Sequence, residues 1–217
     1  MMNNIKAVIF DLDNTLADRK YAFYNHAVRM ADMFMSDRSG DEKERFVKRL
    51  IELDNNGYAV KKQVYDTIFS EFSPSGTADD MKREWNVSAE LFSKTEDGAE
   101  DILKYLNGKY ILALLTNGYT STQNIKLDGT GLRGYFSEVM ISEETGTAKP
   151  DKEIYLMMCR RIGVSPSEAL YVGDHMENDV KGPLSAGLDA VLYDKTGYYG
   201  GAYPKTIASL SELKRYL

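Results

Sequence analysis

Two aspartates spaced two residues apart, Asp11 and Asp13, follow directly after the apolar run Lys6–Phe10. In an extended chain, side chains two residues apart point the same way and lie about 7 Å apart, so the two carboxylates flank one point in space. If the run is a strand, that point lies at its carboxyl end, where open α/β sheets bind their ligands. The alternative is a solvated turn or a helix N-cap, where Asp and Asn are common.

Thr116 and Asn117 come at the end of a second apolar run, Tyr110–Leu115, and Gly118 follows them. A hydroxyl, an amide and a glycine that allows close backbone approach suit the oxygens of a phosphoryl group. The alternative is a plain strand-to-helix turn, which the tripeptide by itself does not exclude.

A cation and two more acids stand at the ends of later elements. Lys149 comes directly before an expected helix, where its ammonium and the helix N-terminus could act on one anion, although a lone lysine there is ordinarily a surface cation. Asp174 and Asp179 follow the apolar run Ala169–Val172. Mg²⁺ binds one or two carboxylates together with water and phosphate oxygens, whereas the alternative is an acidic cap on the next helix.

The four aspartates need an electrostatic reason to gather at one edge of a sheet. Two carboxylates about 4 Å apart repel by about 4 kcal/mol at an effective dielectric constant of about 20. A divalent cation and Lys149 would neutralise that repulsion, and four unrelated turns would supply no such compensation. The sequence therefore predicts one cation-dependent site built from several strand ends.

Five short apolar runs are predicted to be strands, and helical patterns separate the later ones. The expected strands are Lys6–Phe10, Tyr110–Leu115, Glu138–Ile141, Ala169–Val172 and Ala190–Tyr193. Helices are expected over residues 97–106, 149–161, 177–186 and 207–217, the second with a proline and an acid in its first turn. Strands that alternate with helices indicate an α/β fold with a doubly wound, Rossmann-like parallel sheet.

One interval breaks this alternation. About 100 residues separate Leu16 from Thr116, whereas a βαβ unit needs only about 30 residues in all. The surplus holds four helical patterns, at residues 21–35, 41–53, 60–72 and 78–92, with turn residues between them. We therefore expect an α/β catalytic core of residues 1–18 and 96–217 and an inserted all-helical cap of residues 19–95. His26, among apolar neighbours in this insertion, is interpreted as structural.

The composition limits the classes of partner and compartment. With 27 Lys and Arg against 33 Asp and Glu, the formal net charge is −6, so no basic field draws the chain to a nucleic acid polymer or a membrane. No apolar stretch approaches the 18–20 residues of a membrane span, and the first apolar run is too short for a signal peptide. The lone Cys159 cannot form an internal disulfide. We expect a cytoplasmic monomer or homodimer.

Four motifs resemble those of one known family. The segments DLDNT, LLTNG, AKPD and GDHMENDV resemble, in order and spacing, the four motifs of the haloacid dehalogenase-like hydrolase superfamily. The resemblance covers nearly the whole chain, and the helical insertion resembles the cap of that family. The residues of these segments are similar to those of the phosphatase branch, including pyrimidine 5′-nucleotidases and acylneuraminate phosphatases. His175 departs from the small residue expected at that place.

The resemblance implies a nucleophile, an acid–base residue and a metal site. Asp11 would attack phosphorus and form an aspartyl-phosphate, and Asp13 would protonate the leaving oxygen and then activate water. Mg²⁺ would be held by Asp11, by the main-chain carbonyl of Asp13 and by Asp174.

The resemblance also implies the groups that bind the phosphoryl oxygens. Thr116, Asn117 and Lys149 would contact these oxygens, with Lys149 counted among the catalytic residues. Asp179 would orient water or Lys149. The helical cap would exclude water and select the leaving group.

The expected activity is Mg²⁺-dependent hydrolysis of a small phosphorylated metabolite, with a nucleoside monophosphate as the favoured class. A phosphomutase of the same fold keeps the same acids and stays an alternative. So does a phosphate-binding or regulatory module without useful turnover. Dehalogenases of the superfamily lack an acid at the place of Asp13, which ranks them lower.

Overall fold

The computed structural model describes residues 5–217 and divides the chain into two compact units. One unit comprises the chain up to Asp18 together with Thr95–Leu217, and the other is Arg19–Lys94. Thr95, the first residue of the returning segment, forms an antiparallel bridge with Ala17 of the same unit. The two units are described separately below.

The first unit is built on a parallel sheet of six strands in the order β3-β2-β1-β4-β5-β6. The strands are β1 (Ala7–Phe10), β2 (Ile111–Thr116), β3 (Glu138–Ile141), β4 (Ala169–Gly173), β5 (Asp189–Tyr193) and β6 (Thr206–Ile207). The predicted α/β fold with a doubly wound, Rossmann-like parallel sheet is confirmed. The sixth strand is missing from the prediction because two residues carry no periodic signal.

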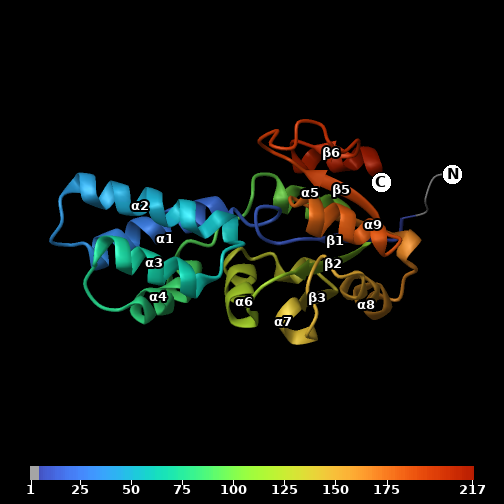
Figure 1. Cartoon of the computed structure of the whole chain (residues 1–217). Helices are drawn as coiled ribbons and strands as arrows, with labels where there is room; N and C mark the ends of the chain where they lie inside the picture. The colour runs from blue at the N-terminus through green and yellow to red at the C-terminus, as the bar shows by residue number, and fades with distance from the viewer. Residues whose placement is uncertain (1–4) are drawn as a thin grey trace. The chain divides into compact units, whose positions relative to one another are not determined.

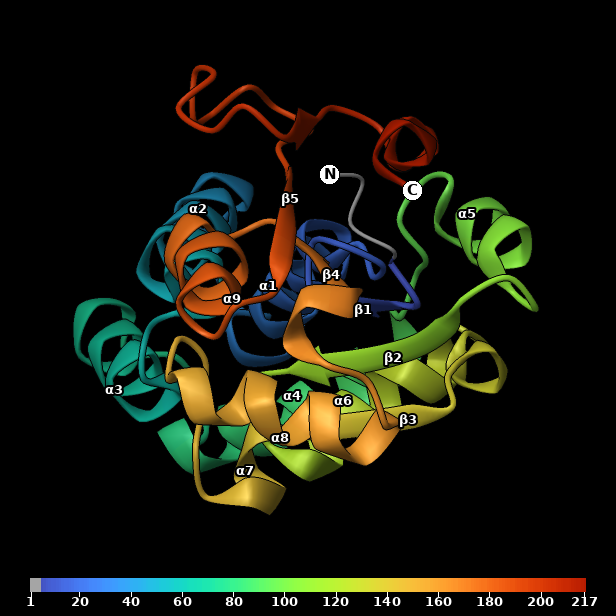
Figure 2. The same cartoon turned by 90° about the vertical axis from the view of Figure 1, so that its right-hand side faces the viewer.

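Side chains of both faces of this sheet are buried, which is why its strands are continuous apolar runs. On one face, Val8 and Phe10 of β1 pack in a cluster that also includes side chains of α5 (Ala99–Leu106) and α6 (Thr120–Gly129). On the other face, Ala7 and Ile9 pack in a cluster with α8 (Lys152–Ile162). Figure 2 shows the strands lying between α5 and α8. The central strand is therefore fixed from both sides.

Two expected helices of this unit differ from the pattern. The helix expected at residue 149 begins at Lys152, because Asp151 is its N-cap and accepts a hydrogen bond from the main-chain N–H of Glu153. The proline and the acid thus precede the first turn. The segment 177–186 is a π-helical turn, Met176–Lys181, followed by α9 (Gly182–Ser185).

Short elements complete the first unit. They are α7 (Ser142–Thr145), the 3₁₀ turns Arg133–Tyr135 and Pro166–Glu168, and a 3₁₀ helix over Leu210–Tyr216. That last helix and β6 occupy the segment expected to be one α-helix from residue 207.

The second unit consists of four α-helices (Figure 1). They are α1 (Arg19–Phe34), α2 (Gly40–Asp54), α3 (Lys61–Phe72) and α4 (Ala78–Leu91), with a 3₁₀ turn at Asn55–Gly57. Capping boxes start two of them, Ser39 with Glu42 before α2 and Thr77 with Asp80 before α4. A cluster of buried apolar side chains, centred on residues such as Met30, forms a core of its own.

This core also encloses polar groups that pair with one another. Both terminal guanidinium nitrogens of Arg19 contact the carboxylate of Asp54, at 2.8 and 3.0 Å, and Lys61 binds the same carboxylate. His26 lies fully buried with one ring nitrogen 2.9 Å from the hydroxyl of Ser88 and the other 2.9 Å from that of Tyr65. These contacts compensate the cost of burying polar groups and support a structural role for His26.

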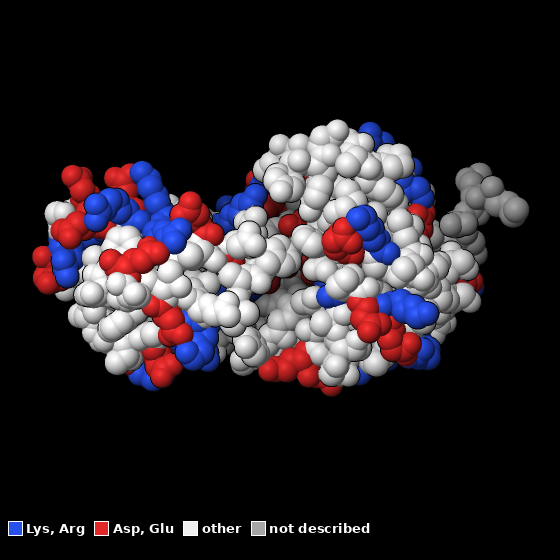
Figure 3. All heavy atoms as spheres, in the orientation of Figure 1, with Lys and Arg blue, Asp and Glu red and all other residues white. Residues whose placement is uncertain are grey.

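On the face shown in Figure 3, acidic and basic side chains are interspersed over the helical unit. The ion pairs of this unit include i,i+4 pairs such as Glu44 with Lys48 and Lys62 with Asp66. Solvent screens exposed pairs of this kind, so they add little, and the buried core supplies most of the stability of this unit.

No helix within residues 5–217 combines the length and the apolar character needed to cross a membrane.

Candidate active site

Strand β1 occupies the point where the strand order of the sheet reverses. It pairs with β2 on one side and β4 on the other, with Phe10 level with Leu114 and Val172. The residues that follow these three strands therefore meet at one edge, the carboxyl edge at which α/β sheets bind ligands. This topology brings together the DLDNT, LLTNG and GDHMENDV segments.

Asp11 and Lys149 form the centre of this edge. The ammonium nitrogen of Lys149 lies 2.7 Å from Oδ1 of Asp11, and both residues are only 6% exposed. Burial raises the pKa of Asp11 to about 7, against the opposing effect of Lys149, and the neighbouring Asp179 adds to the increase. Asp11 is thus a carboxyl group whose charged form is held mainly by one lysine.

Asp179 fixes the position of Lys149. Its Oδ1 accepts from the lysine ammonium at 2.7 Å, and its Oδ2 accepts from the main-chain N–H of His175 at 2.9 Å. Burial works against the charge on Lys149, but Asp11 and Asp179 outweigh it and hold the pKa of the ammonium well above its usual range. The close approach of Asp179 requires a glycine at position 173, where a Cβ atom would overlap the Asp179 carboxyl group.

Tyr171 is a further partner of Lys149 that the sequence pattern does not reveal. Its hydroxyl lies 2.9 Å from the lysine ammonium and donates to the main-chain oxygen of Leu115 at 2.8 Å. Within β4 this tyrosine has the pattern of an ordinary core aromatic. The only available signal is a hydroxyl in an otherwise apolar buried run, because a buried tyrosine hydroxyl usually finds a partner.

Three carboxylates converge beside Lys149. One oxygen from each of Asp11, Asp174 and Asp179 lies within 4.8 Å of the others. Burial raises the pKa of Asp174 well above its usual range, and the charges of Asp179 and Asp11 add to this effect. Lys149 offsets only part of the negative charge of this group, so the group has an excess of carboxylate charge in a buried place.

This carboxylate group fits a hard divalent cation. Mg²⁺ prefers oxygen ligands and uses one or two protein carboxylates, leaving positions for water and phosphate oxygens. Burial is the main cause that raises the pKa of Asp11 and of Asp174, and the neighbouring carboxylates add to it, so a cation bound here would favour their charged forms. The donor set therefore matches Mg²⁺ in both ligand type and charge.

Asp13 lies on the tight turn that follows β1. The main-chain oxygen of Leu12 accepts from the N–H groups of Leu16 and Ala17, at 2.9 and 2.8 Å, and Asn14 has a left-handed φ of 58°. The Asp13 carboxylate is not part of the three-carboxylate group among the described residues. It instead contacts side chains of α6.

Those α6 side chains, Gln123 and Lys126, are absent from the sequence-based candidates. Lys126 lies 2.8 and 2.7 Å from the two carboxylate oxygens of Asp13, and Gln123 donates to one of them at 3.2 Å. Gln123 also donates to the hydroxyl of Thr116 at 2.7 Å. A possible signal is the i,i+3 spacing of two polar residues on the buried side of a helix.

Thr116 is the last residue of β2, which pairs with β1, and Asn117 follows it directly. The side chain of Asn117 bonds the main chain of Lys149 on both sides: its amide donates to the lysine carbonyl, and its oxygen accepts from the lysine N–H, both at 2.9 Å. Asn117 therefore holds the AKPD segment in place. Its expected contact with a phosphoryl oxygen stays a prediction.

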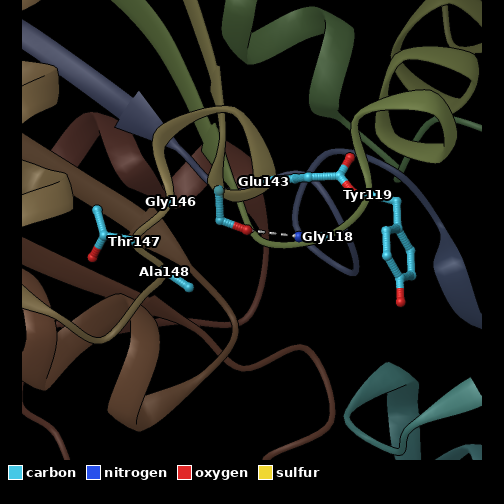
Figure 4. A pocket seen from close by; sticks show the side chains of 7 residues that line it. Gly118, Tyr119, Glu143, Gly146, Thr147 and Ala148 are labelled. Atoms are coloured by element: carbon cyan, nitrogen blue, oxygen red, sulfur yellow. Dashed lines mark hydrogen bonds between the residues drawn. The ribbon is translucent and has the colours of Figure 1, made fainter.

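An open pocket of about 360 Å³ adjoins these segments. Figure 4 shows its lining from the Gly118–Tyr119 turn, from α7 and from the Gly146–Ala148 loop, with a hydrogen bond from the N–H of Gly118 to the Ser142 hydroxyl at 3.1 Å. The pocket is thus bordered by the residues that directly precede Lys149 and follow Asn117.

Comparison with known proteins agrees with this geometry. The chain is 27% identical over 215 residues to the N-acylneuraminate-9-phosphatase of Rattus norvegicus, covering 90% of this chain and 85% of the relative. It is 36% identical over 136 residues to the pyrimidine 5′-nucleotidase YjjG of Escherichia coli, covering 61% and 60%.

A solved structure resembles the entire chain. The crystal structure of the putative HAD-hydrolase YfnB from Bacillus subtilis, bound to magnesium, matches with a TM-score of 0.77 and 26% identity over 98% of both chains. The family model described as haloacid dehalogenase-like hydrolase matches residues 8–193, which include all four motifs. The chain therefore belongs to the haloacid dehalogenase-like hydrolase family.

Proposed function

We propose that this protein is a Mg²⁺-dependent phosphomonoesterase that acts through an aspartyl-phosphate at Asp11. The observation that carries the proposal is the buried contact of Asp11 with Lys149 at the carboxyl end of the central strand, with Asp174 and Asp179 beside it. Relatives named as phosphatases within the same family support the reaction class.

Asp11 would be the nucleophile of the first displacement. Its carboxylate oxygen forms a bond to phosphorus while the bond from phosphorus to the leaving oxygen breaks. Lys149 favours the ionised form of this carboxylate, whose pKa burial raises to about 7, and places a positive charge beside the phosphoryl oxygens. Thr116, at the end of the neighbouring strand, offers a hydroxyl to the same oxygens.

Asp13 would carry the proton in both displacements. In the first, it donates a proton to the leaving oxygen as that oxygen departs from phosphorus. In the second, it accepts a proton from the water that attacks the aspartyl-phosphate, and this restores Asp11 and releases inorganic phosphate. Dehalogenases of the superfamily lack an acid at this place, so the presence of Asp13 favours phosphatase activity over dehalogenase activity.

Asp11, Asp174 and the main-chain carbonyl of Asp13 would hold Mg²⁺, with Asp179 orienting Lys149. The ion would supply positive charge that offsets the negative charge of the carboxylates and of the phosphate. The magnesium reported with the YfnB structure supports this choice of metal.

The helical unit Arg19–Lys94 would act as the cap that selects the leaving group. We propose a small phosphorylated metabolite as substrate, with a nucleoside monophosphate as the first class to test. The nucleotidase named among the relatives supports this class. The relative named N-acylneuraminate-9-phosphatase is the reason to test phosphorylated sugars as well.

The test is phosphate release from p-nitrophenyl phosphate, nucleoside monophosphates and sugar phosphates, each with Mg²⁺ and with a chelator. We expect Mg²⁺-dependent release from at least one substrate. No release from any of them would contradict the proposal and favour a binding module. A reaction that requires a bisphosphate and returns an isomeric monophosphate would instead identify a phosphomutase.

A further inference from the structure

Helix α6 buries polar side chains where a helix usually buries apolar ones. Its buried residues are Thr122, Gln123, Lys126 and Leu127, of which only the last is apolar. Such a face contributes little hydrophobic stabilisation, and burying an amide and an ammonium is costly unless both are paired. The contacts of these two groups therefore decide what this face of the helix is for.

The partners of both groups converge on one residue. Lys126 contacts both oxygens of the Asp13 carboxylate, Gln123 contacts one of them, and the lysine also donates to the Gln123 side-chain oxygen at 2.9 Å. The hydrogen bonds among these three side chains join α6 to the turn after β1. Rotation of the Asp13 side chain would break at least two of these contacts.

Exposure differs between the two ends of this ion pair. The side chain of Asp13 is 22% exposed, whereas that of Lys126 is 8% exposed. The lysine therefore holds the carboxyl group from the protein interior, while the carboxyl group keeps a side that a substrate can reach.

Stability alone gives a weak reason for this arrangement. A buried ion pair can often be replaced by apolar residues of similar size at no cost in stability, because desolvation of the charges cancels their attraction. Gln123 also links Asp13 to Thr116. The same helix therefore contacts two groups that face the reacting phosphate in the proposed mechanism.

We propose that Lys126 and Gln123 are positioning residues that fix the carboxyl group of Asp13 for its proton transfers. This inference rests on the proposed phosphatase function and deepens it, since it assigns roles to two residues outside the four motifs. Both residues act through Asp13, which they contact directly.

The proposal makes a prediction about leaving groups. An alkoxide leaves slowly without a proton, so hydrolysis of an alkyl phosphate depends on the acid. The p-nitrophenolate anion is stable and leaves without protonation, so phosphoryl transfer from p-nitrophenyl phosphate does not depend on the acid. A displaced Asp13 should therefore slow phosphoryl transfer from the alkyl substrate selectively.

The experiment measures kcat/KM for glycerol phosphate and for p-nitrophenyl phosphate with Lys126→Met. We expect the ratio of alkyl to aryl kcat/KM to fall at least about tenfold, since general acid catalysis contributes about 10²–10⁴-fold. The value of kcat for both substrates should also fall, because Asp13 activates water in the common second step. Lys126→Arg should restore most of the ratio.

Two further variants make the test decisive. Lys104→Met on α5, an exposed lysine that pairs with Glu100 on the same helix, should leave the ratio unchanged. Gln123→Met should lower the ratio in the same direction as Lys126→Met, and it serves as the test should the lysine variant fail to fold. An unchanged or increased ratio in a folded variant would overturn the inference.

The outcome also separates this inference from the proposed function. A wild-type protein that hydrolyses neither these two substrates nor any other phosphate ester contradicts the phosphatase itself. A wild-type phosphatase whose alkyl-to-aryl ratio does not respond to either α6 variant contradicts only the role of α6.

Discussion

The ammonium group of Lys149 and the carboxylate of Asp11 lie 2.7 Å apart in the protein interior, although 138 residues separate them in the chain. Asp179 and Tyr171 hold the lysine from two further directions, at 2.7 and 2.9 Å. Asp11 is thus a buried nucleophile candidate with one cation in direct contact. The charge balance around this pair leads to the predictions below.

Lys149→Met should lower both stability and activity. Removal of the cation leaves Asp11 and Asp179 buried without their partner, which costs about 3 kcal/mol or more. The loss should grow as the pH rises, because more carboxylate charge is then confined in the folded state. Urea denaturation at pH 6 and pH 8 measures this, with Lys152→Met as the surface control. Equal midpoints for both variants would contradict the assignment of Lys149 as the counter-ion.

Gly173→Ala should distort the site although glycine has no side chain to lose. A Cβ atom at this position would overlap the carboxyl group of Asp179 and displace it from Lys149. We expect destabilisation of about 1–3 kcal/mol and a large fall in kcat. Gly134→Ala, where a Cβ would meet no atom within 4 Å, is the matched control. Equal melting temperatures and equal kcat values for the two alanine variants would contradict this explanation.

Asp174→Asn should weaken Mg²⁺ activation more than it weakens folding. Residues that merely support metal ligands change affinity about 10–100-fold, so loss of a ligand should raise the Mg²⁺ concentration for half-maximal activity at least about tenfold. Removal of a carboxylate from a crowded group should also leave the apo-protein no less stable. Asp101→Asn on α5 is the control, and an unchanged Mg²⁺ requirement for Asp174→Asn would remove this residue from the metal site.

His26 should make the helical unit sensitive to acid. Burial, assisted by the charge of Lys61, lowers the pKa of His26 to about 3, whereas an unfolded histidine titrates near 6.5. The stabilisation is complete above about pH 6.5 and decreases as the pH falls toward 3, because the unfolded chain binds a proton that the folded chain excludes. The loss at pH 5 is about 2 kcal/mol.

The measurement is urea denaturation of the wild type and of His26→Gln between pH 7 and pH 4. The variant removes the titrating group but keeps polar atoms for Ser88 and Tyr65. Its stability should fall less steeply than that of the wild type below pH 6.5. Parallel curves for the two proteins would show that His26 does not titrate as its burial requires.

Much of the site could be predicted because its chemistry is concentrated at strand ends. Asp11, Thr116 and Asp174 each follow an apolar run, and strands that are parallel present these ends at one edge. The four helical patterns of the insertion are equally readable, because their apolar residues recur between clear turn residues.

The residues that sequence reasoning missed depend on partners far away in the chain. Lys126 and Gln123 meet Asp13 across 113 and 110 residues, so local periodicity treats them as polar positions of an ordinary helix. Tyr171 is hidden for the opposite reason, because its ring fits the apolar pattern of β4 and its hydroxyl does not alter that pattern. The sequence pattern also places the start of α8 too early, because Asp151 caps the helix from outside the first turn.

Trapping of the covalent intermediate tests the central claim most directly. Wild-type protein mixed with Mg²⁺ and p-nitrophenyl phosphate, quenched with acid within the first turnovers and digested, should yield a phosphorylated peptide whose modification lies on Asp11. Asp11→Asn should yield none and should release no phosphate. Turnover with the phosphoryl group on another residue, or undiminished turnover by Asp11→Asn, would contradict the account.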